Sequence, residues 1–205
     1  MIFADANLAR AARAAASGIF FNAGQVCSAG SRVLVERRAY DEVVDRLVEH
    51  ARRVRLGDPS DPETTMGPVI SETQMKSVLN YIDVGKAEGA SAVAGGRRIG
   101  STGFFIEPTI FANVKHEMRI SQEEIFGPVL SVIPFDDEAE AVRIANGTAY
   151  SLAAGVWSAD SSRVQSAPHG CQAQSGHGLD QYLRLYRCKA AVGRSRRIGH
   201  GARAW

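Results

Sequence analysis

The residue best suited to covalent chemistry is Cys27, which lies in the segment 20–32 between Gly24 on one side and Ala29 and Gly30 on the other. A thiol at such a junction of small residues can be exposed to a substrate while its own backbone N–H stays free to donate. An isolated cysteine in an apolar context is more often an inert, buried residue. The residue type alone therefore leaves two interpretations of Cys27, a nucleophile or a small core residue.

The offsets of its neighbours favour the nucleophile. The segment reads FFNAGQVCSAGSR and resembles the nucleophile motif of the aldehyde dehydrogenase superfamily, close to F-x-N-x-G-Q-x-C-x-x-G-S-R. The fixed positions are filled by Phe20 or Phe21 and by Asn22, Gly24, Gln25, Cys27, Gly30, Ser31 and Arg32. A core cysteine does not require Asn, Gln, Gly and Ser at fixed offsets, so we expect Cys27 to be the nucleophile. Asn22 and Gln25 are expected to brace the loop.

The resemblance extends over residues 1–160. Segments 56–71 (LGDPSDPETTMGPVIS), 103–111 (GFFIEPTIF) and 122–132 (QEEIFGPVLSV) match further motifs of the superfamily, in order and at similar spacing. The chain is therefore identified as an aldehyde dehydrogenase fragment. Residues 1–162 are expected to belong to the catalytic, thiol-bearing domain.

The resemblance implies a reaction and a set of site residues. The reaction is the NAD(P)-dependent oxidation of an aldehyde to a carboxylic acid through a thiohemiacetal and a thioester on Cys27. Glu124 matches the position that holds the nicotinamide ribose, and Phe126 matches the one near the nicotinamide ring. A surface carboxylate and a core phenylalanine are the alternatives for these two. Phe21 matches a position that lines the substrate tunnel, although an aromatic near a helix end is often core packing.

Strands and helices alternate along the chain, which predicts an α/β layered sheet with flanking helices, incomplete at both ends. Helices are expected from the region of Asp5 to Ile19, over 41–54, and after Ser71, each with an apolar face. Strands are expected at 33–35, 91–94, 129–135 and 152–157. Residues 104–114 are expected to be extended, with Pro108 marking an edge or a bulge.

The amino-acid composition limits the class of protein and its cellular location. The chain has 205 residues, of which 45% are hydrophobic and 22% charged, as is ordinary for a globular protein. We expect no membrane span and no signal peptide, because no apolar run is long enough and Asp5 follows the first residues at once. Three cysteines form no disulfide framework and five histidines have no metal-ligand spacing, so we expect a cytoplasmic protein without a metal.

Residues from Arg163 onward differ in character. They hold eight of the 24 Lys and Arg residues but a single acid, Asp180, and show no helical or strand period. When their degenerate codons are read one nucleotide later, three superfamily motifs appear in order. They resemble T-V-W-I-N-T-Y, W-G-G and S-G-x-G-R-E. We therefore expect segment 163–205 to be translated out of frame, with the change of frame between Ser161 and Gly176, and to have no stable fold.

Several superfamily features are expected to be missing. These are the N-terminal dinucleotide-binding domain, the general-base glutamate and an oxyanion-binding asparagine, since the match begins inside an I-V-F-x-D-A segment. Little or no activity is therefore expected from this chain alone, although its superfamily acts on small aldehydes and forms homo-oligomers. The alternatives are a non-enzymatic module that docks to full-length homologues, or nucleic-acid binding by the basic segment, which we do not expect.

Overall fold

The centre of the molecule is a four-stranded sheet in the order β1-β6-β5-β2, made of β1 (Arg32–Glu36), β6 (Val129–Phe135), β5 (Thr109–Ala112) and β2 (Ser91–Ala94). The structure is a computed structural model, and it describes residues 1–150, 152–160, 171–175 and 182–188. The last two segments are described by their backbone alone. The strands β1, β6 and β5 are parallel, and β2 is antiparallel to β5. Residues on β1 and β6 are buried almost without interruption, as expected of parallel strands covered on both faces.

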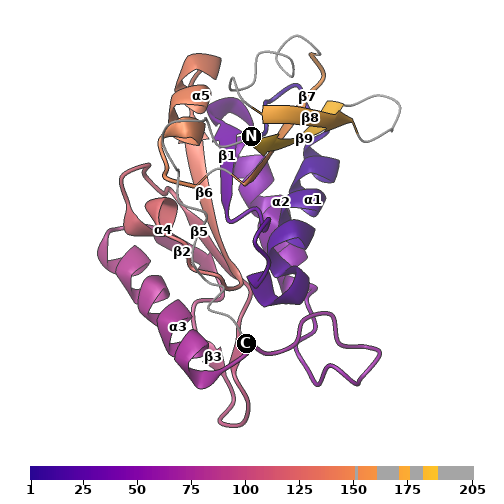
Figure 1. Ribbon diagram of the computed structural model, residues 1–205, viewed down its shortest axis with the longest axis vertical. Coiled ribbons are helices and arrows are strands. Elements are labelled where there is room, and N and C mark those ends of the chain that lie inside the picture. Colours follow the sequence, from indigo (N-terminus) through magenta and orange to yellow (C-terminus); the bar gives the residue numbers. More distant parts are fainter. Residues whose placement is uncertain (151, 161–170, 176–181, 189–205) are drawn as a thin grey trace.

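Helices cover this sheet on two sides. In Figure 1, α1 (Leu8–Phe20) and α2 (Tyr40–Arg52) lie on one side, and α3 (Glu72–Ala87) lies on the other. Side-chain oxygens cap two of these helices: Asn7 Oδ1 accepts from Arg10 N at 3.1 Å, and Ser71 Oγ accepts from Gln74 N at 3.2 Å. The short helix α4 (Arg119–Gln122) and α5 (Glu138–Asn146) complete the set, with the 3₁₀ turns η1 (Phe21–Gly24) and η2 (Arg37–Ala39).

Residues 1–3 join the central sheet to a further strand, β7 (Ala153–Ser158). Ile2 forms parallel bridges to Val35 of β1 and to Trp157 of β7, and its N–H donates to Leu34 O at 2.8 Å. The buried carboxylate of Glu36 holds the next turn, because it accepts from Ala4 N at 2.8 Å and pairs with Arg38. The first residues therefore act as a strand between two parts of the sheet.

The predicted α/β layers and the main helices are confirmed, with small differences in their bounds. The extended run 104–114 is divided at Pro108 into β4 (Phe105–Ile106) and β5, and β4 pairs with β3 (Arg98–Ile99) in a hairpin. Pro has no N–H for a ladder, which explains the break. No described helix is both long and apolar enough to cross a bilayer.

Segment 163–205 is expected from its sequence to lack a stable fold, and within it the structure describes two strands. These are β8 (Cys171–Ser175) and β9 (Tyr182–Cys188), and β9 pairs antiparallel with both β7 and β8. The run Tyr-Leu-Arg-Leu-Tyr in β9 consists largely of residue types found in strands. The rest of the segment lies outside the described residues, and the stability of the whole segment stays a prediction.

Replacement of Tyr40 by phenylalanine tests how α2 is attached to the sheet. The buried Tyr40 hydroxyl donates to Val132 O at 3.2 Å and accepts from Asn113 N at 2.6 Å, and burial raises the pKa of Tyr40. Tyr40→Phe leaves the Asn113 N–H without an acceptor, so we expect the free energy of unfolding to fall by about 1–3 kcal/mol. Urea titration measures this. The matched Tyr150→Phe variant removes an exposed hydroxyl and is expected to stay within about 0.5 kcal/mol of the parent.

Candidate functional site

The loop that carries Cys27 follows α1 through a left-handed turn. Asn22, Ala23 and Gly24 have φ values of 50°, 52° and 72°, and they follow Phe21, the C-cap residue of α1. Such values are unusual for residues other than glycine. The turn leaves Cys27 exposed, and its backbone N–H donates to no group among the described residues. The accessible thiol and the available N–H expected from the sequence are thus both present.

Asn22 and Gln25 hold this turn by reciprocal hydrogen bonds. Asn22 Nδ2 donates to Gln25 O at 3.1 Å, and Gln25 Nε2 donates to Asn22 O at 3.2 Å. The remaining polar atom of the Gln25 side chain, Oε1, accepts from Ile70 N at 2.9 Å. Both residues therefore brace the loop, as their positions in the motif indicate, and Gln25 also ties it to the segment that enters α3.

Gly24 brings the Cys27 loop into backbone contact with a second loop. A Cβ atom at Gly24 would lie 2.0 Å from the carbonyl oxygen of Gly127, so no side chain fits there. Gly127 follows Glu124 and Phe126, the two residues that the sequence assigns to the cofactor. The two predicted halves of the site, separated by about a hundred residues in sequence, therefore meet at this contact.

The two adjacent carboxylates of the second loop have different surroundings. Glu123 accepts from Tyr81 Oη at 2.9 Å and forms an ion pair with Arg119 at 2.7 Å, and the hydrogen bond from Arg119 holds the pKa of Glu123 below its usual range. Glu124 is half-buried, and no described residue forms a hydrogen bond or ion pair with its carboxylate. Glu124 is therefore the one of the two that is available to bind a ligand.

Phe126 has a strained backbone. Its φ of 55° lies in the left-handed region, where a bulky side chain is a genuine outlier. Gln74 of α3 stabilises this turn, since its Nε2 donates to Ile125 O at 3.1 Å and to Phe126 O at 2.9 Å. The sequence does not predict this role of Gln74, because no local pattern indicates a contact with residues about fifty positions away.

Phe21 lies on the surface beside the Cys27 loop. Its side chain is 71% exposed, and Ile70, which is bonded to the same loop through its N–H, is 75% exposed. These are the two most exposed large apolar side chains among the described residues. The alternative of core packing is therefore wrong for Phe21, which is open to contact with another molecule or segment.

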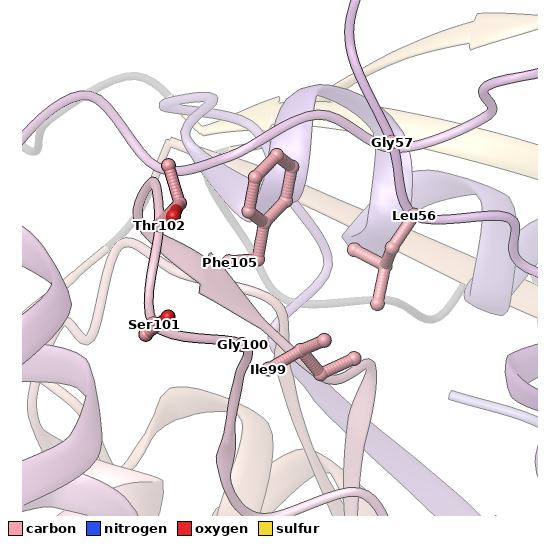
Figure 2. Close-up of a pocket in the computed structure, with 7 residues that line it drawn as sticks. All are labelled: Leu56, Gly57, Ile99, Gly100, Ser101, Thr102 and Phe105. Carbon is pink, nitrogen blue, oxygen red and sulfur yellow. The ribbon is translucent and has the colours of Figure 1, made fainter.

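A pocket of about 320 Å³ lies elsewhere, between the loop after α2 and the β3–β4 hairpin. Figure 2 shows Leu56 opposite Phe105 and Ile99, with Ser101 and Thr102 on the hairpin loop. None of its lining residues comes from the Cys27 loop or from the Glu124–Phe126 turn, so it is separate from the candidate site. No group of three or more His, Cys, Asp and Glu residues within the described part could hold a metal ion.

A methyl group at Gly24 tests the contact between the two loops. Gly24→Ala places a Cβ against Gly127 and keeps a left-handed φ, so we expect a loss of about 2–4 kcal/mol in the free energy of unfolding, measured with urea. Gly18→Ala is the matched control. Nothing lies within 4 Å of its added Cβ, and it sits inside α1, so it should gain about 0.5–1 kcal/mol. Equal midpoints for Gly24→Ala and the parent would contradict the contact.

The sequence of this chain is similar to that of a known protein family. The model of the aldehyde dehydrogenase family matches residues 1–175. Aldehyde dehydrogenase family 2 member C4 of Arabidopsis thaliana is 44% identical over 173 residues, which is 84% of this chain and 34% of that protein.

Solved structures give the same result. The AldA indole-3-acetaldehyde dehydrogenase of P. syringae, in a complex with NAD⁺ and IAA, is 50% identical with a TM-score of 0.78, and the match covers 79% of this chain and 33% of that one. A betaine aldehyde dehydrogenase of Staphylococcus aureus in complex with NAD⁺ is 37% identical with a TM-score of 0.78, covering 90% of this chain and 41% of that one. The chain spans about a third of the length of the curated relative and about a third to two fifths of these structures. On sequence and fold together, the chain belongs to the aldehyde dehydrogenase family.

Proposed function

We propose that this chain carries the thiol-bearing part of an enzyme that oxidises aldehydes to carboxylic acids with NAD or NADP, and that Cys27 is its nucleophile. The observation that carries the proposal is the state of Cys27. Its thiol is exposed, its backbone N–H is available, and its loop is fixed by Gln25 and Gly24 against the turn that bears Glu124. A buried core cysteine would have none of these features.

The chemistry begins with attack of the Cys27 sulfur on the carbonyl carbon of the aldehyde. A C–S bond forms, the C=O π electrons move to oxygen, and the backbone N–H of Cys27 donates to that oxygen. A bound nicotinamide, held by Glu124 and Phe126, would supply the acceptor for the hydride of the thiohemiacetal carbon, whose loss leaves a thioester on Cys27. Water then hydrolyses the thioester, which releases the carboxylic acid and the thiol. Phe21 supplies an apolar wall for the aldehyde's substituent.

Two residues of the chain fit the ribose end of a dinucleotide. The Glu124 carboxylate is half-buried and unpaired among the described residues, so it can accept from two ribose hydroxyls, as carboxylates do in other dinucleotide sites. Glu123 is already engaged by Arg119 and Tyr81. The half-buried Phe126 ring lies two residues from Glu124, where it can pack near the nicotinamide. The NAD⁺ in the solved relatives supports NAD or NADP as the cofactor.

We infer that this chain alone turns over little. No described side chain forms a hydrogen bond with the Cys27 sulfur, so no described residue is placed as its general base. Loss of a general base commonly lowers rates by ~10²–10⁴-fold.

We propose a cytoplasmic location on the basis of the cysteine usage, since a reducing compartment keeps the thiol free. We also propose a homo-oligomer as the assembly, as the resemblance to the family implies.

A second candidate is a docking module that binds full-length homologues without catalysis. The exposure of Phe21 and Ile70 favours it, since two large apolar side chains at one loop suit a protein interface. The two candidates differ in whether the thiol of Cys27 is used.

We also propose that residues beyond the frame change, which lies between Ser161 and Gly176, do not derive from the family's own reading frame. The match to the family model ends at residue 175, inside this interval, and so supports the proposal. The genomic sequence at this position decides it.

Limiting iodoacetamide tests the nucleophile. We expect rapid alkylation of Cys27, the most reactive thiol of the folded part, mapped by mass spectrometry, because its loop keeps the thiol accessible. The Cys27→Ser variant should lose this fast phase while Cys171 and Cys188 react as in the parent. Protection of Cys27 in the native protein would contradict the assignment. Rapid NADH formation from acetaldehyde by the parent would instead contradict the proposed lack of activity.

Limited trypsin digestion tests segment 163–205. Its basic side chains are costly to bury without partners, and ordering the backbone costs ~1–2 kcal/mol per residue, so we expect cleavage there first and a product that ends near Arg163. The internal control is α2, which also contains arginines but packs on the sheet. Equal resistance of Arg184 and Arg187 in β9 and of the arginines in α2 would argue against an unstable segment.

A further inference from the structure

The side chain of Gln74 is used in a way that its local sequence does not predict. Gln74 is the third residue after Ser71, the cap of α3, and Ser-x-x-Gln is the pattern of a capping box. The first half of the box is present, because Ser71 Oγ accepts from Gln74 N at 3.2 Å. The Gln74 amide does not donate within its own helix, however, but to the turn that carries Phe126.

The two acceptors are consecutive carbonyls. Gln74 Nε2 donates to Ile125 O at 3.1 Å and to Phe126 O at 2.9 Å. Both carbonyl oxygens can face one donor group because Phe126 has a φ of 55° between them. Left-handed backbone at a bulky residue persists only where its surroundings determine it. The Gln74 amide is therefore a support for the conformation of Phe126.

A second residue of α3 packs on the same turn. Val78 lies one helical turn after Gln74, and its Cγ2 would be 2.5 Å from a Cβ at Gly127. Gly127 O in turn faces Gly24 of the Cys27 loop. The turn is thus held between α3 on one side and the Cys27 loop on the other.

These contacts form a closed ring. Gln25 of the Cys27 loop accepts from Ile70 N, which lies next to the cap of α3, and α3 leads through Gln74 to Phe126 and Gly127. Gly127 then returns to Gly24, one residue before Gln25. Loss of any link removes a constraint on the position of Glu124 and Phe126 relative to Cys27.

We propose that Gln74 is a positioning residue for the reaction, which sets the cofactor turn against the nucleophile loop without touching the reacting atoms. The proposal rests on the proposed function of Cys27, Glu124 and Phe126. A purely structural role would confine the effect of a Gln74 substitution to α3 and the turn at Phe126. A positioning role requires that the substitution also changes the conformation of the Cys27 loop.

The test uses the full chain and two variants of similar shape that lack the amide donor, Gln74→Glu and Gln74→Met. Lys76→Ala is the matched control, since Lys76 lies on the exposed face of the same helix and forms an ion pair only with Glu72 among the described residues. Two readouts are compared among folded proteins. They are the backbone amide resonances of residues 24–27 and 124–127, and the binding of nicotinamide mononucleotide measured through the resonances of Glu124 and Phe126.

We expect both Gln74 variants to shift the amides of Phe126, Gly127 and Gly24, and to weaken binding of the mononucleotide about fivefold, as expected for about one net hydrogen bond. Lys76→Ala should reproduce the parent in both readouts. Amide shifts that stop at Gly127 and leave Gly24 and Cys27 unchanged would overturn the proposal. If the parent does not bind the mononucleotide, the cofactor assignment fails, while the resonance of Gly24 still decides the role of Gln74.

Discussion

The close approach of Gly24 to Gly127 is the constraint on which the candidate site depends. A Cβ atom at Gly24 would lie only 2.0 Å from the carbonyl oxygen of Gly127, so the backbones of these two glycines are in direct contact and leave no room for a side chain. The contact fixes a thiol loop from the start of the chain against a carboxylate-bearing turn from its later part. Both loops adopt left-handed backbone to reach it. Gln25 Nε2, which donates to Asn22 O, and Gln74 Nε2, which donates to Phe126 O, maintain that conformation.

The parallel strands place these loops by their shared direction. β1 begins five residues after Cys27 and pairs with β6, which begins just after Gly127, so the strands lead away from the site side by side. Arg32, the last residue of the nucleophile motif, stabilises the fold rather than the reacting groups. Its guanidinium donates to Ala145 O at 3.3 Å, near the end of α5, and burial lowers its pKa. A motif residue can thus be explained by helix capping without any chemical role.

The sequence predicted the α/β class, the main helices and the exposed Cys27, because apolar periodicity and a long motif are local signals. It did not predict the left-handed φ of Phe126, since a phenylalanine has no intrinsic preference for that conformation. It also missed the use of Gln74, where a tertiary contact replaces a local cap. The strand β9 lies in a segment without an evident period, where the residue types of Tyr-Leu-Arg-Leu-Tyr still suit a strand. Local patterns therefore specify elements, and the contacts between loops remain to be found in three dimensions.

The position of residues 1–3 has a consequence for the order in which this chain can fold. Ile2 bridges β1 and β7, so its hydrogen bonds join residues 1–3 to Trp157, more than 150 positions later in the sequence. Contacts of such long sequence separation close large loops and form slowly. Until β7 emerges, residues 1–3 can pair with β1 on one side only, and their other edge is open. The nascent chain therefore presents an open strand edge until β7 has been made, and shielding of that edge by a chaperone would favour folding over aggregation.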